Sequence, residues 1–330
     1  MSQAAIAPEV APEVTPQAAS KVAPPGAAQV PAEPAAIRPC LRNAMTVDVE
    51  DWFQVQAFAD AIPREEWGFL ASRIEANTEH VLQHFEAAGV RATFFTLGWI
   101  AERYPALIRR IVAAGHELAS HGYGHERVDR IGAVAFRADI RRARALLEDS
   151  GGVAVRGYRA PTFSIGPHTP WAHEILAEEG HQYSSSVFPV RHDAYGAPDA
   201  PRRPHRPRPD GVIELPLTTC RAFGRNLPCS GGGWFRLSPY RLFRAGLRHV
   251  NTVDGRPGIF YFHPWEVDPA QPHVWHADRL ARFRHYTGVS RMSPRLERLL
   301  RDFSWGTMEE VFAGEIGAHP VPAALHAMAD

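Results

Sequence analysis

Cysteine is scarce in this sequence. Among 330 residues there are only three, Cys40, Cys220 and Cys229. Three cysteines so far apart cannot build a disulfide framework or a closed thiolate metal site, so any bound metal must be held by histidine and carboxylate side chains. For Cys220 and Cys229 we favour two free thiols, with a disulfide between them as the alternative in an oxidising compartment.

Lysine is rarer still, because Lys21 is the only one. Lys+Arg and Asp+Glu both number 36, so the formal net charge is +0 and there is no general attraction to nucleic acid or to anionic membranes. The sequence also lacks apolar runs of about 18 residues, which a membrane span needs, and the features of a signal peptide. We therefore expect a cytoplasmic protein with no transmembrane segment and no nucleic-acid partner; association with the cell envelope is the alternative.

The composition changes along the chain and divides it into four parts. Residues 1–39 are rich in alanine and proline and contain no aromatic residue, which predicts disorder. Residues 40–263 carry the alternating pattern of one folded domain. Residues 264–317 are expected to pack on that domain as a C-terminal extension, and residues 318–330 to form a flexible tail.

Short apolar runs alternate with amphipathic stretches in the folded region, which is the pattern of an α/β protein. We expect strands at 44–49, 91–97, 116–120, 155–159, 181–186, 211–215 and 257–262. We expect helices at 72–88, 105–114 and 133–149, and three more whose N-caps are marked by Thr169-Pro170, Ser238-Pro239 and Ser293-Pro294. Roughly seven strands with helices between most of them favour a parallel barrel over an open sheet.

Polar residues stand where four of these strands end: Asp48, His121, Arg159 and His263. The carboxyl ends of the strands of a parallel barrel share one face. We therefore expect these four side chains, although distant in the sequence, to converge on one site.

The segment His121-Gly122-Tyr123-Gly124-His125 is the candidate metal motif. It follows a strand, and its glycines let the backbone turn close to a ligand. A second pair with the same spacing, His80 and His84, lies inside an amphipathic helix and is expected to face solvent instead.

Carboxylates at Asp48, Glu50 and Asp51 complete the candidate metal site. Two histidines and one carboxylate leave open positions on a divalent ion, and a second carboxylate kept off the metal can take a proton from water. The alternative is that Glu50 and Asp51 cap a turn and that Asp48 forms a surface ion pair.

Five motifs, in order, carry a family resemblance. They are Thr46-Val47-Asp48-Val49-Glu50-Asp51-Trp52-Phe53, Ser120-His121-Gly122-Tyr123-Gly124-His125, Arg159-Ala160-Pro161-Thr162-Phe163, Tyr183-Ser184-Ser185-Ser186-Val187-Phe188-Pro189 and Phe260-Tyr261-Phe262-His263-Pro264-Trp265-Glu266. Over roughly residues 43–312 the chain resembles the NodB-homology polysaccharide deacetylases, also called carbohydrate esterase family 4. Within that family it most resembles the subgroup associated with exosortase and PEP-CTERM exopolysaccharide loci.

The resemblance implies a fold, an activity and residue roles. The fold is a distorted (β/α)7 barrel, here with a C-terminal helical extension. The activity is removal of N-acetyl groups from an N-acetylated (exo)polysaccharide by metal-activated water, with one divalent ion, most often Zn²⁺. The resemblance implies that Asp48 is the base, that Arg159 holds the base in place, that His263 is the acid, and that His121 and His125 ligate the metal. An association with exopolysaccharide synthesis machinery is a further expectation.

Two departures from the family pattern stand out. The usual motif is Thr-Phe-Asp-Asp, with the metal carboxylate next to the base, but here Val49 takes that place. Glu50 lies on the same side of the strand as Asp48, whereas Asp51 requires the chain to turn first. We slightly favour Asp51 as the ligand because of its side-chain type, with Glu50 nearly equal. In addition, Ser184 stands where relatives usually carry Asp.

Several residues are candidates for substrate contact. Trp234 and Trp265 could stack on sugar rings or fill the core, and Tyr123 and Pro161 could line the same cleft. Residues 199–210 are read as an irregular surface loop, although an acidic polysaccharide could meet its arginines. Two functional alternatives stay open: a non-catalytic carbohydrate-binding barrel, and a hydrolase of cyclic amides or imides on the same scaffold.

Overall fold

The computed structural model describes residues 41–193 and 195–317. The predicted disordered segment at 1–39 and the predicted tail at 318–330 lie outside the described residues, as does Cys40. Cys220 and Cys229 are both buried and are free thiols. No helix in the described ranges has the length and hydrophobicity that a bilayer span requires.

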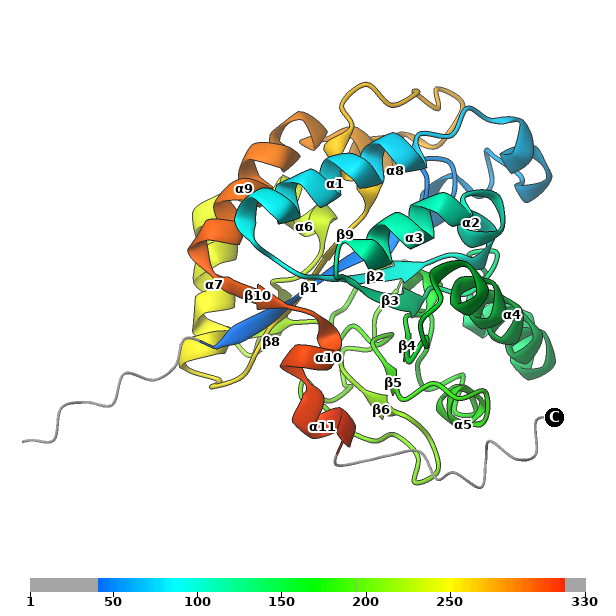
Figure 1. Cartoon of the computed structure of the whole chain (residues 1–330). Helices are drawn as coiled ribbons and strands as arrows, with labels where there is room; N and C mark the ends of the chain where they lie inside the picture. The colour runs from blue at the N-terminus through cyan, green and yellow to red at the C-terminus, as the bar shows by residue number, and fades with distance from the viewer. Residues whose placement is uncertain (1–40, 194, 318–330) are drawn as a thin grey trace, which may run out of the picture. The chain divides into compact units, whose positions relative to one another are not determined.

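A curved parallel sheet lies at the centre of the described residues (Figure 1). Its strands are β1 (Arg42–Val49), β2 (Thr93–Thr96), β3 (Glu117–Ser120), β4 (Gly157–Tyr158), β5 (Tyr183–Ser184), β6 (Ile213–Glu214), β9 (Ile259–Phe262) and β10 (Ser304–Gly306). Consecutive strands pair from β1 to β6. Thr46 and Val47 pair with both β2 and β9, so β2 and β9 lie on opposite edges of β1.

These pairings make seven parallel strands from β9 through β1 to β6, in agreement with the predicted (β/α)7 class. Within the described residues no ladder joins β6 to β9, so the barrel is incomplete there. The chain between these strands forms a separate antiparallel hairpin, β7 (Thr219–Ala222) and β8 (Arg225–Pro228).

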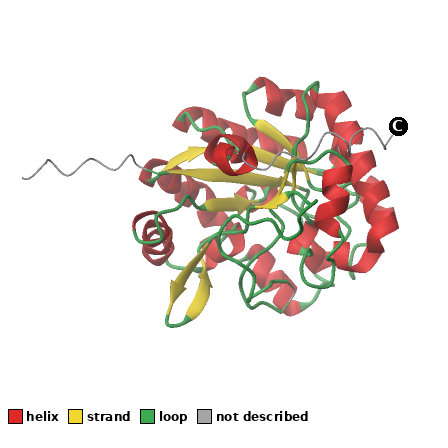
Figure 2. Cartoon of the chain, turned by 90° about the horizontal axis from the view of Figure 1, so that it is seen from below, coloured by secondary structure: helices red, strands yellow, loops and turns green. Residues whose placement is uncertain are grey.

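Helices surround the sheet (Figure 2). They are α1 (Ile74–Ala88), α2 (Gly98–Arg103), α3 (Pro105–Ala113), α4 (Val128–Gly151), α5 (Ala172–Glu178), α6 (Gly232–Leu237), α7 (Tyr240–Thr252), α8 (Arg279–Tyr286), α9 (Met292–Asp302), α10 (Met308–Val311) and α11 (Ala313–Gly317). Short 3₁₀ turns are η1 (Gln56–Phe58), η2 (Arg64–Phe69), η3 (Pro161–Phe163), η4 (Pro264–Val267) and η5 (Val289–Arg291). The extension adds β10, which pairs with the first residues of β1.

The three predicted N-caps are wrong in detail, although a helix begins near each. The N-cap residues are Trp171, Pro239 and Arg291, not the predicted Ser or Thr. The Thr169 hydroxyl instead bonds the backbone of Gly166. Proline is tolerated anywhere in a first turn because the N–H groups there have no partner within the helix. A Ser/Thr-Pro pair therefore marks the region of a helix start but not its cap.

Side chains along the strands alternate between two cores. In β1, Met45, Val47 and Val49 belong to the core that the outer helices share, whereas Ala44 belongs to the core inside the barrel. The strand period of two therefore directs Asp48 inward along with Ala44. In β3 and β9, Ala119 and Tyr261 face inward by the same rule, so the residues two positions later continue the inner rows.

Glu117 is the first residue of β3, and its carboxylate connects the barrel to the C-terminal extension. Its carboxylate accepts hydrogen bonds from Thr93 Oγ1 at 2.6 Å, from the backbone N–H of Glu309 at 3.0 Å and from the Tyr183 hydroxyl. Burial, together with the nearby Glu309 carboxylate, raises the pKa of Glu117 from 4.5 to about 7. The folded protein therefore favours the protonated form of Glu117 more than the unfolded chain does.

We expect this group to make stability depend on pH. A folded-state pKa raised to about 7 gives stabilisation that is present below pH 4.5 and is lost as the pH rises through 7. Glu117→Gln keeps a neutral side chain at every pH, so between pH 5 and pH 8 its free energy of unfolding should improve relative to wild type by about 1–3 kcal/mol. Urea unfolding at several pH values measures this, and a difference that does not change with pH would contradict it.

Candidate active site

The structure gathers the polar residues from the strand ends into one buried cluster. Asp48 ends the inner row of β1, and Glu50 follows it on the same side. His121 comes two residues after Ala119, His263 two residues after Tyr261, and Arg159 directly follows β4. All five lie at the carboxyl ends of parallel strands, where a barrel places its active site.

Arg159 holds Asp48 in a buried ion pair. Its Nη1 donates to Asp48 Oδ1 at 2.6 Å and to Thr46 Oγ1 at 2.7 Å. Its Nε and Nη2 donate to the backbone oxygen and the hydroxyl of Ser185, and its guanidinium lies 4.0 Å from the centre of the Phe95 ring. Arg159 is fully buried and Asp48 is 2% exposed. The orientation of the Asp48 carboxylate is therefore set by a side chain that is itself fixed on several sides.

Glu50, His121 and His125 form the one group of three or more potential metal ligands among the described residues. One donor atom from each lies within 4.8 Å of the others. Glu50 Oε2 lies 2.7 Å from His125 Nε2, yet this buried oxygen has no hydrogen-bond partner. His121 Nδ1 lies 2.8 Å from the Arg159 carbonyl oxygen, which leaves Nε2 as the ligand atom. A buried carboxylate oxygen that accepts no hydrogen bond and lies beside two imidazoles fits a divalent cation.

A tight loop, and not a helical turn, brings the two imidazoles together. Gly122 has φ +75° and His125 has φ +55°. Asp139 of α4 accepts hydrogen bonds from the backbone N–H groups of Tyr123 and Gly124, and a Cβ at Gly122 would lie 2.7 Å from its carboxylate. Asp139 thus holds the loop, and only glycine fits at position 122.

Charges within the cluster favour the ionisation states that a metal site needs. Burial is the largest effect on Glu50 and opposes its ionisation, but His125 and His263 overcome it and lower the pKa of Glu50 to about 2. Burial lowers the pKa of His121 to about 4. The cluster therefore offers an ionised carboxylate and a neutral imidazole, as metal coordination requires.

The structure places Asp51, the slightly favoured ligand, outside the group formed by Glu50, His121 and His125. Asp51 Oδ2 accepts from the Ser72 hydroxyl at 2.7 Å and from the backbone N–H of Arg73 at 2.9 Å, and Oδ1 accepts from the backbone N–H of Trp52. The chain turns directly after β1, where the N–H of Glu50 donates to the carbonyl oxygen of Asp48 at 3.1 Å. Asp51 then bonds the start of α1, whereas the Glu50 carboxylate lies against His125.

His263 is supported by a chain of charged groups behind it. Its Nδ1 lies 2.9 Å from Glu266 Oε1, and Glu266 Oε2 accepts from Arg236 Nε at 2.6 Å. Its Nε2 faces Glu50 Oε1 at 3.5 Å. Burial opposes the charged ring, but Glu50 and Glu266 outweigh it and raise the pKa of His263 to about 9. Gly232 lets α6 approach, since a Cβ there would lie 2.1 Å from the Glu266 carboxylate.

Trp265 has a supporting role and is not available as a sugar platform. Its ring stacks on His263 and on His285, with centroids 5.1 and 4.0 Å away, and the residue is 6% exposed. Its Nε1 donates to Glu50 Oε1 at 3.3 Å. The expectation of substrate contact is therefore corrected: Trp265 positions Glu50 and His263.

The three other residues predicted to contact substrate, Tyr123, Pro161 and Trp234, lie in three different surroundings. The Tyr123 hydroxyl donates to Glu102 at 2.7 Å, and the Arg142 guanidinium covers its ring at 3.7 Å, so Tyr123 lies against α2 and α4 and not in the cluster, contrary to expectation. Pro161 is buried in η3, two residues after Arg159. Trp234 is half-buried and lines a separate cavity.

A cavity of about 400 Å³ opens beside His125. The loop after β1 supplies Phe53 and Trp67 to its wall, and Arg64 holds that loop to the second imidazole by donating to the His125 carbonyl at 3.0 Å.

Sequence reasoning missed three supporting residues. Glu266 stands three positions after His263 in the fifth motif, and this spacing was a usable signal. Arg236 and Asp139 gave no signal in the sequence, because their partners, Glu266 and Tyr123, lie 30 and 16 residues away along the chain.

Comparison with known proteins gives two adjoining family matches. Residues 60–183 match a model described as polysaccharide deacetylase, and residues 185–313 match a domain of unknown function, DUF3473. A peptidoglycan-N-acetylglucosamine deacetylase of Bacillus cereus is 31% identical over 84 residues, which cover 26% of this chain and 30% of that protein. A chitooligosaccharide deacetylase of Sinorhizobium fredii is 31% identical over 149 residues, covering 44% and 61%. The chain thus spans less than two thirds of each of these relatives.

Solved structures share the fold. A Mycobacterium smegmatis protein assigned to the polysaccharide deacetylases superposes with a TM-score of 0.51 at 20% identity, covering 85% of this chain and 93% of that one. Puue allantoinase superposes with a TM-score of 0.52 at 16% identity, covering 86% and 92%. At such identities the likeness concerns the fold alone. Residues 60–183 thus resemble the polysaccharide deacetylases in sequence, and the chain shares the fold of the two superposed structures.

Proposed function

We propose that the chain is a metal-dependent hydrolase that removes N-acetyl groups from an N-acetylated polysaccharide. One observation carries the proposal: the buried Asp48–Arg159 pair lies in the same cluster as Glu50, which has an oxygen without a hydrogen-bond partner beside two imidazoles. This arrangement supplies a carboxylate outside the ligand set but beside it, which is what hydrolysis of an amide by activated water needs.

Glu50, His121 and His125 would hold the divalent ion, and we propose Zn²⁺. When bound, such an ion polarises the acetyl carbonyl and acidifies a nearby water molecule. The three ligands leave coordination positions open for substrate, as in catalytic zinc sites.

In the proposed reaction Asp48 takes a proton from the water that attacks the acetyl carbonyl carbon. Arg159 keeps Asp48 oriented for this transfer. The bond between the carbonyl carbon and the amide nitrogen then breaks, acetate leaves, and the nitrogen takes a proton from His263 Nε2. Because Glu266 is bound to Nδ1 of His263, Nε2 remains the atom that faces the site.

The relatives support an amino-sugar polymer as substrate, since they are named for peptidoglycan and for chitooligosaccharides. The resemblance to the exosortase-associated subgroup leads us to propose an exopolysaccharide within that class. Association with its synthesis machinery, at the cytoplasmic side of the envelope, is part of the same proposal. Acetate release from N-acetylated oligosaccharides, assayed beside ammonia and ring-opened products from cyclic amides, tests the reaction class. Binding of the oligosaccharides without release of any product would instead indicate a carbohydrate-binding barrel.

Metal binding should depend on Glu50 and not on Asp51. Glu50→Gln removes the ionised ligand. After dialysis against zinc, this variant should therefore contain much less than one zinc ion per chain. Asp51→Asn is the matched control: it should keep the metal, because Asp51 bonds the start of α1. Elemental analysis of both variants decides between them, and metal loss in Asp51→Asn with retention in Glu50→Gln would reverse the assignment.

Loss of the base should separate chemistry from metal binding. Asp48→Asn keeps the shape of the side chain but cannot take a proton, so acetate release should fall by about 10²–10⁴-fold. The zinc content should stay at one ion per chain. Wild-type turnover in this variant would rule out Asp48 as the base.

Loss of the acid should depend on the leaving group. His263→Ala should slow acetate release from an N-acetylated sugar by about 10²-fold or more, because the amine must be protonated as it leaves. Hydrolysis of p-nitrophenyl acetate, whose leaving group needs no proton, should be much less affected. Equal losses on the two substrates would point to a structural role for His263.

A further inference from the structure

A second and larger cavity lies between the β7–β8 hairpin and the segment after β5. Its volume is about 1090 Å³, above the roughly 300–1,000 Å³ of typical small-molecule sites. The hairpin supplies Arg221 and Arg225, the segment at 190–203 supplies Arg191, and Trp234 of α6 forms part of the wall. A cavity of this size has room for several rings of a polymer.

The lining of this cavity is strongly cationic, although the chain has a net charge of +0. Its charged residues are Arg191, Arg202, Arg203, Arg221, Arg225 and a single carboxylate, Asp199. Arg202 is neutralised by Asp254 at 2.6 Å.

Three of the other arginines have free guanidinium groups. Arg191, Arg221 and Arg225 are exposed, and none of them forms an ion pair or a side-chain hydrogen bond with any residue in 41–193 or 195–317. Their charges are therefore available to a ligand.

The cavity adjoins the candidate active site through a run of aromatic contacts. Trp234 Nε1 donates to the Tyr195 hydroxyl at 3.3 Å, and Tyr195 packs on Phe163 at 5.7 Å. Phe163 packs on Tyr261 at 4.9 Å, and Tyr261 meets the edge of His263 at 5.9 Å. Three side chains, Tyr195, Phe163 and Tyr261, thus stand between Trp234 of the cavity wall and His263.

We propose that this arginine-lined cavity binds carboxylate-bearing sugars of the same polysaccharide whose N-acetylated sugar is hydrolysed at the Glu50–His121–His125 site. The guanidinium fork matches a carboxylate with two parallel hydrogen bonds, so free arginines select an acidic chain over a neutral one. The inference rests on the proposed deacetylation and narrows its substrate to an acidic polysaccharide.

The test compares two probes that differ only in charge. One is a hexasaccharide of alternating glucuronate and N-acetylglucosamine, and the other is the same hexasaccharide with its carboxyl groups reduced to alcohols. Surface plasmon resonance with the full-length protein immobilised measures both affinities. At low salt the acidic probe should bind at least about tenfold more tightly, and high salt should remove most of that preference.

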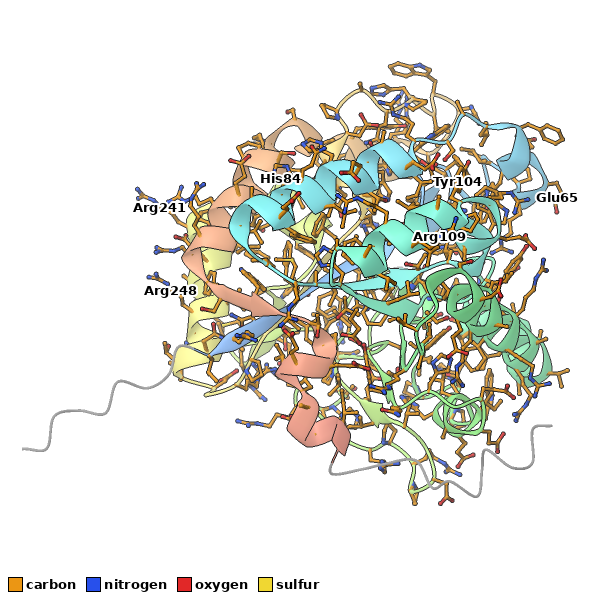
Figure 3. All side chains as sticks on the ribbon, viewed as in Figure 1. Glu65, His84, Tyr104, Arg109, Arg241 and Arg248 are labelled. Atoms are coloured by element: carbon orange, nitrogen blue, oxygen red, sulfur yellow. The ribbon has the colours of Figure 1, made fainter. Side chains whose placement is uncertain are left out.

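The variant R191Q/R221Q/R225Q should lose the preference for the acidic probe. The control R109Q/R241Q/R248Q removes the same charge from exposed helix positions outside the cavity. Figure 3 shows Arg241 and Arg248 pointing away from the barrel on α7, and Arg109 on α3. The control should keep both the preference and wild-type acetate release. Arg221→Glu alone, at an exposed hairpin position, should weaken acidic-probe binding without a change in thermal unfolding.

Each other outcome counts against a defined claim. Equal binding of the two probes, a preference that survives in the cavity variant, or an equal loss in the control variant would overturn the acidic site. Acetate release from a neutral N-acetylglucosamine hexamer tests the reaction separately. Release without charge preference leaves the deacetylase proposal standing and removes the cavity proposal. Preference without release from any probe leaves a site for acidic sugars but removes the deacetylase proposal, and with it the claim that both sites bind one substrate.

Discussion

The buried ion pair between Arg159 and Asp48 is the interaction on which the rest of the site depends. Arg159 bonds side chains of β1, both the backbone and the hydroxyl of Ser185, and, through its own carbonyl oxygen, the ring of His121. One residue thus fixes the Asp48 carboxylate through its side chain and the ring of His121 through its backbone. Losing one partner of such a pair leaves an uncompensated buried charge, which costs roughly 3–5 kcal/mol.

Much of this arrangement was predictable because the strand period of two is strict. It directs Asp48 and Glu50 to the same side of β1, and this argument was stronger than the argument from side-chain type that favoured Asp51. The parallel order of the strands likewise followed from the alternation of apolar runs and helices. What the sequence could not supply was the partner of each side chain. Tyr123 and Trp265 stand in the family motifs, but their contacts come from residues elsewhere in the sequence. The Tyr123 hydroxyl donates to Glu102, and the Trp265 ring stacks on His285.

The C-terminal extension belongs to the site as well as to the fold. It supplies Glu266 behind His263, and the stacked His285 beneath Trp265, and its strand β10 pairs with β1. The boundary that composition suggested at residue 263 therefore separates His263 from its own support. The second family match, residues 185–313, begins much earlier and includes both.

The hairpin of β7 and β8 stands outside the parallel ladder and lies between β6 and β9 in the sequence. Since no strand of the barrel takes its register from the hairpin, its exposed positions can be exchanged without disturbing the strands that carry Asp48 and His121. In the proposals made above, selection among polymers and cleavage of the acetyl bond belong to separate stretches of chain, so that natural variation or engineering could retune the first while the second stays intact.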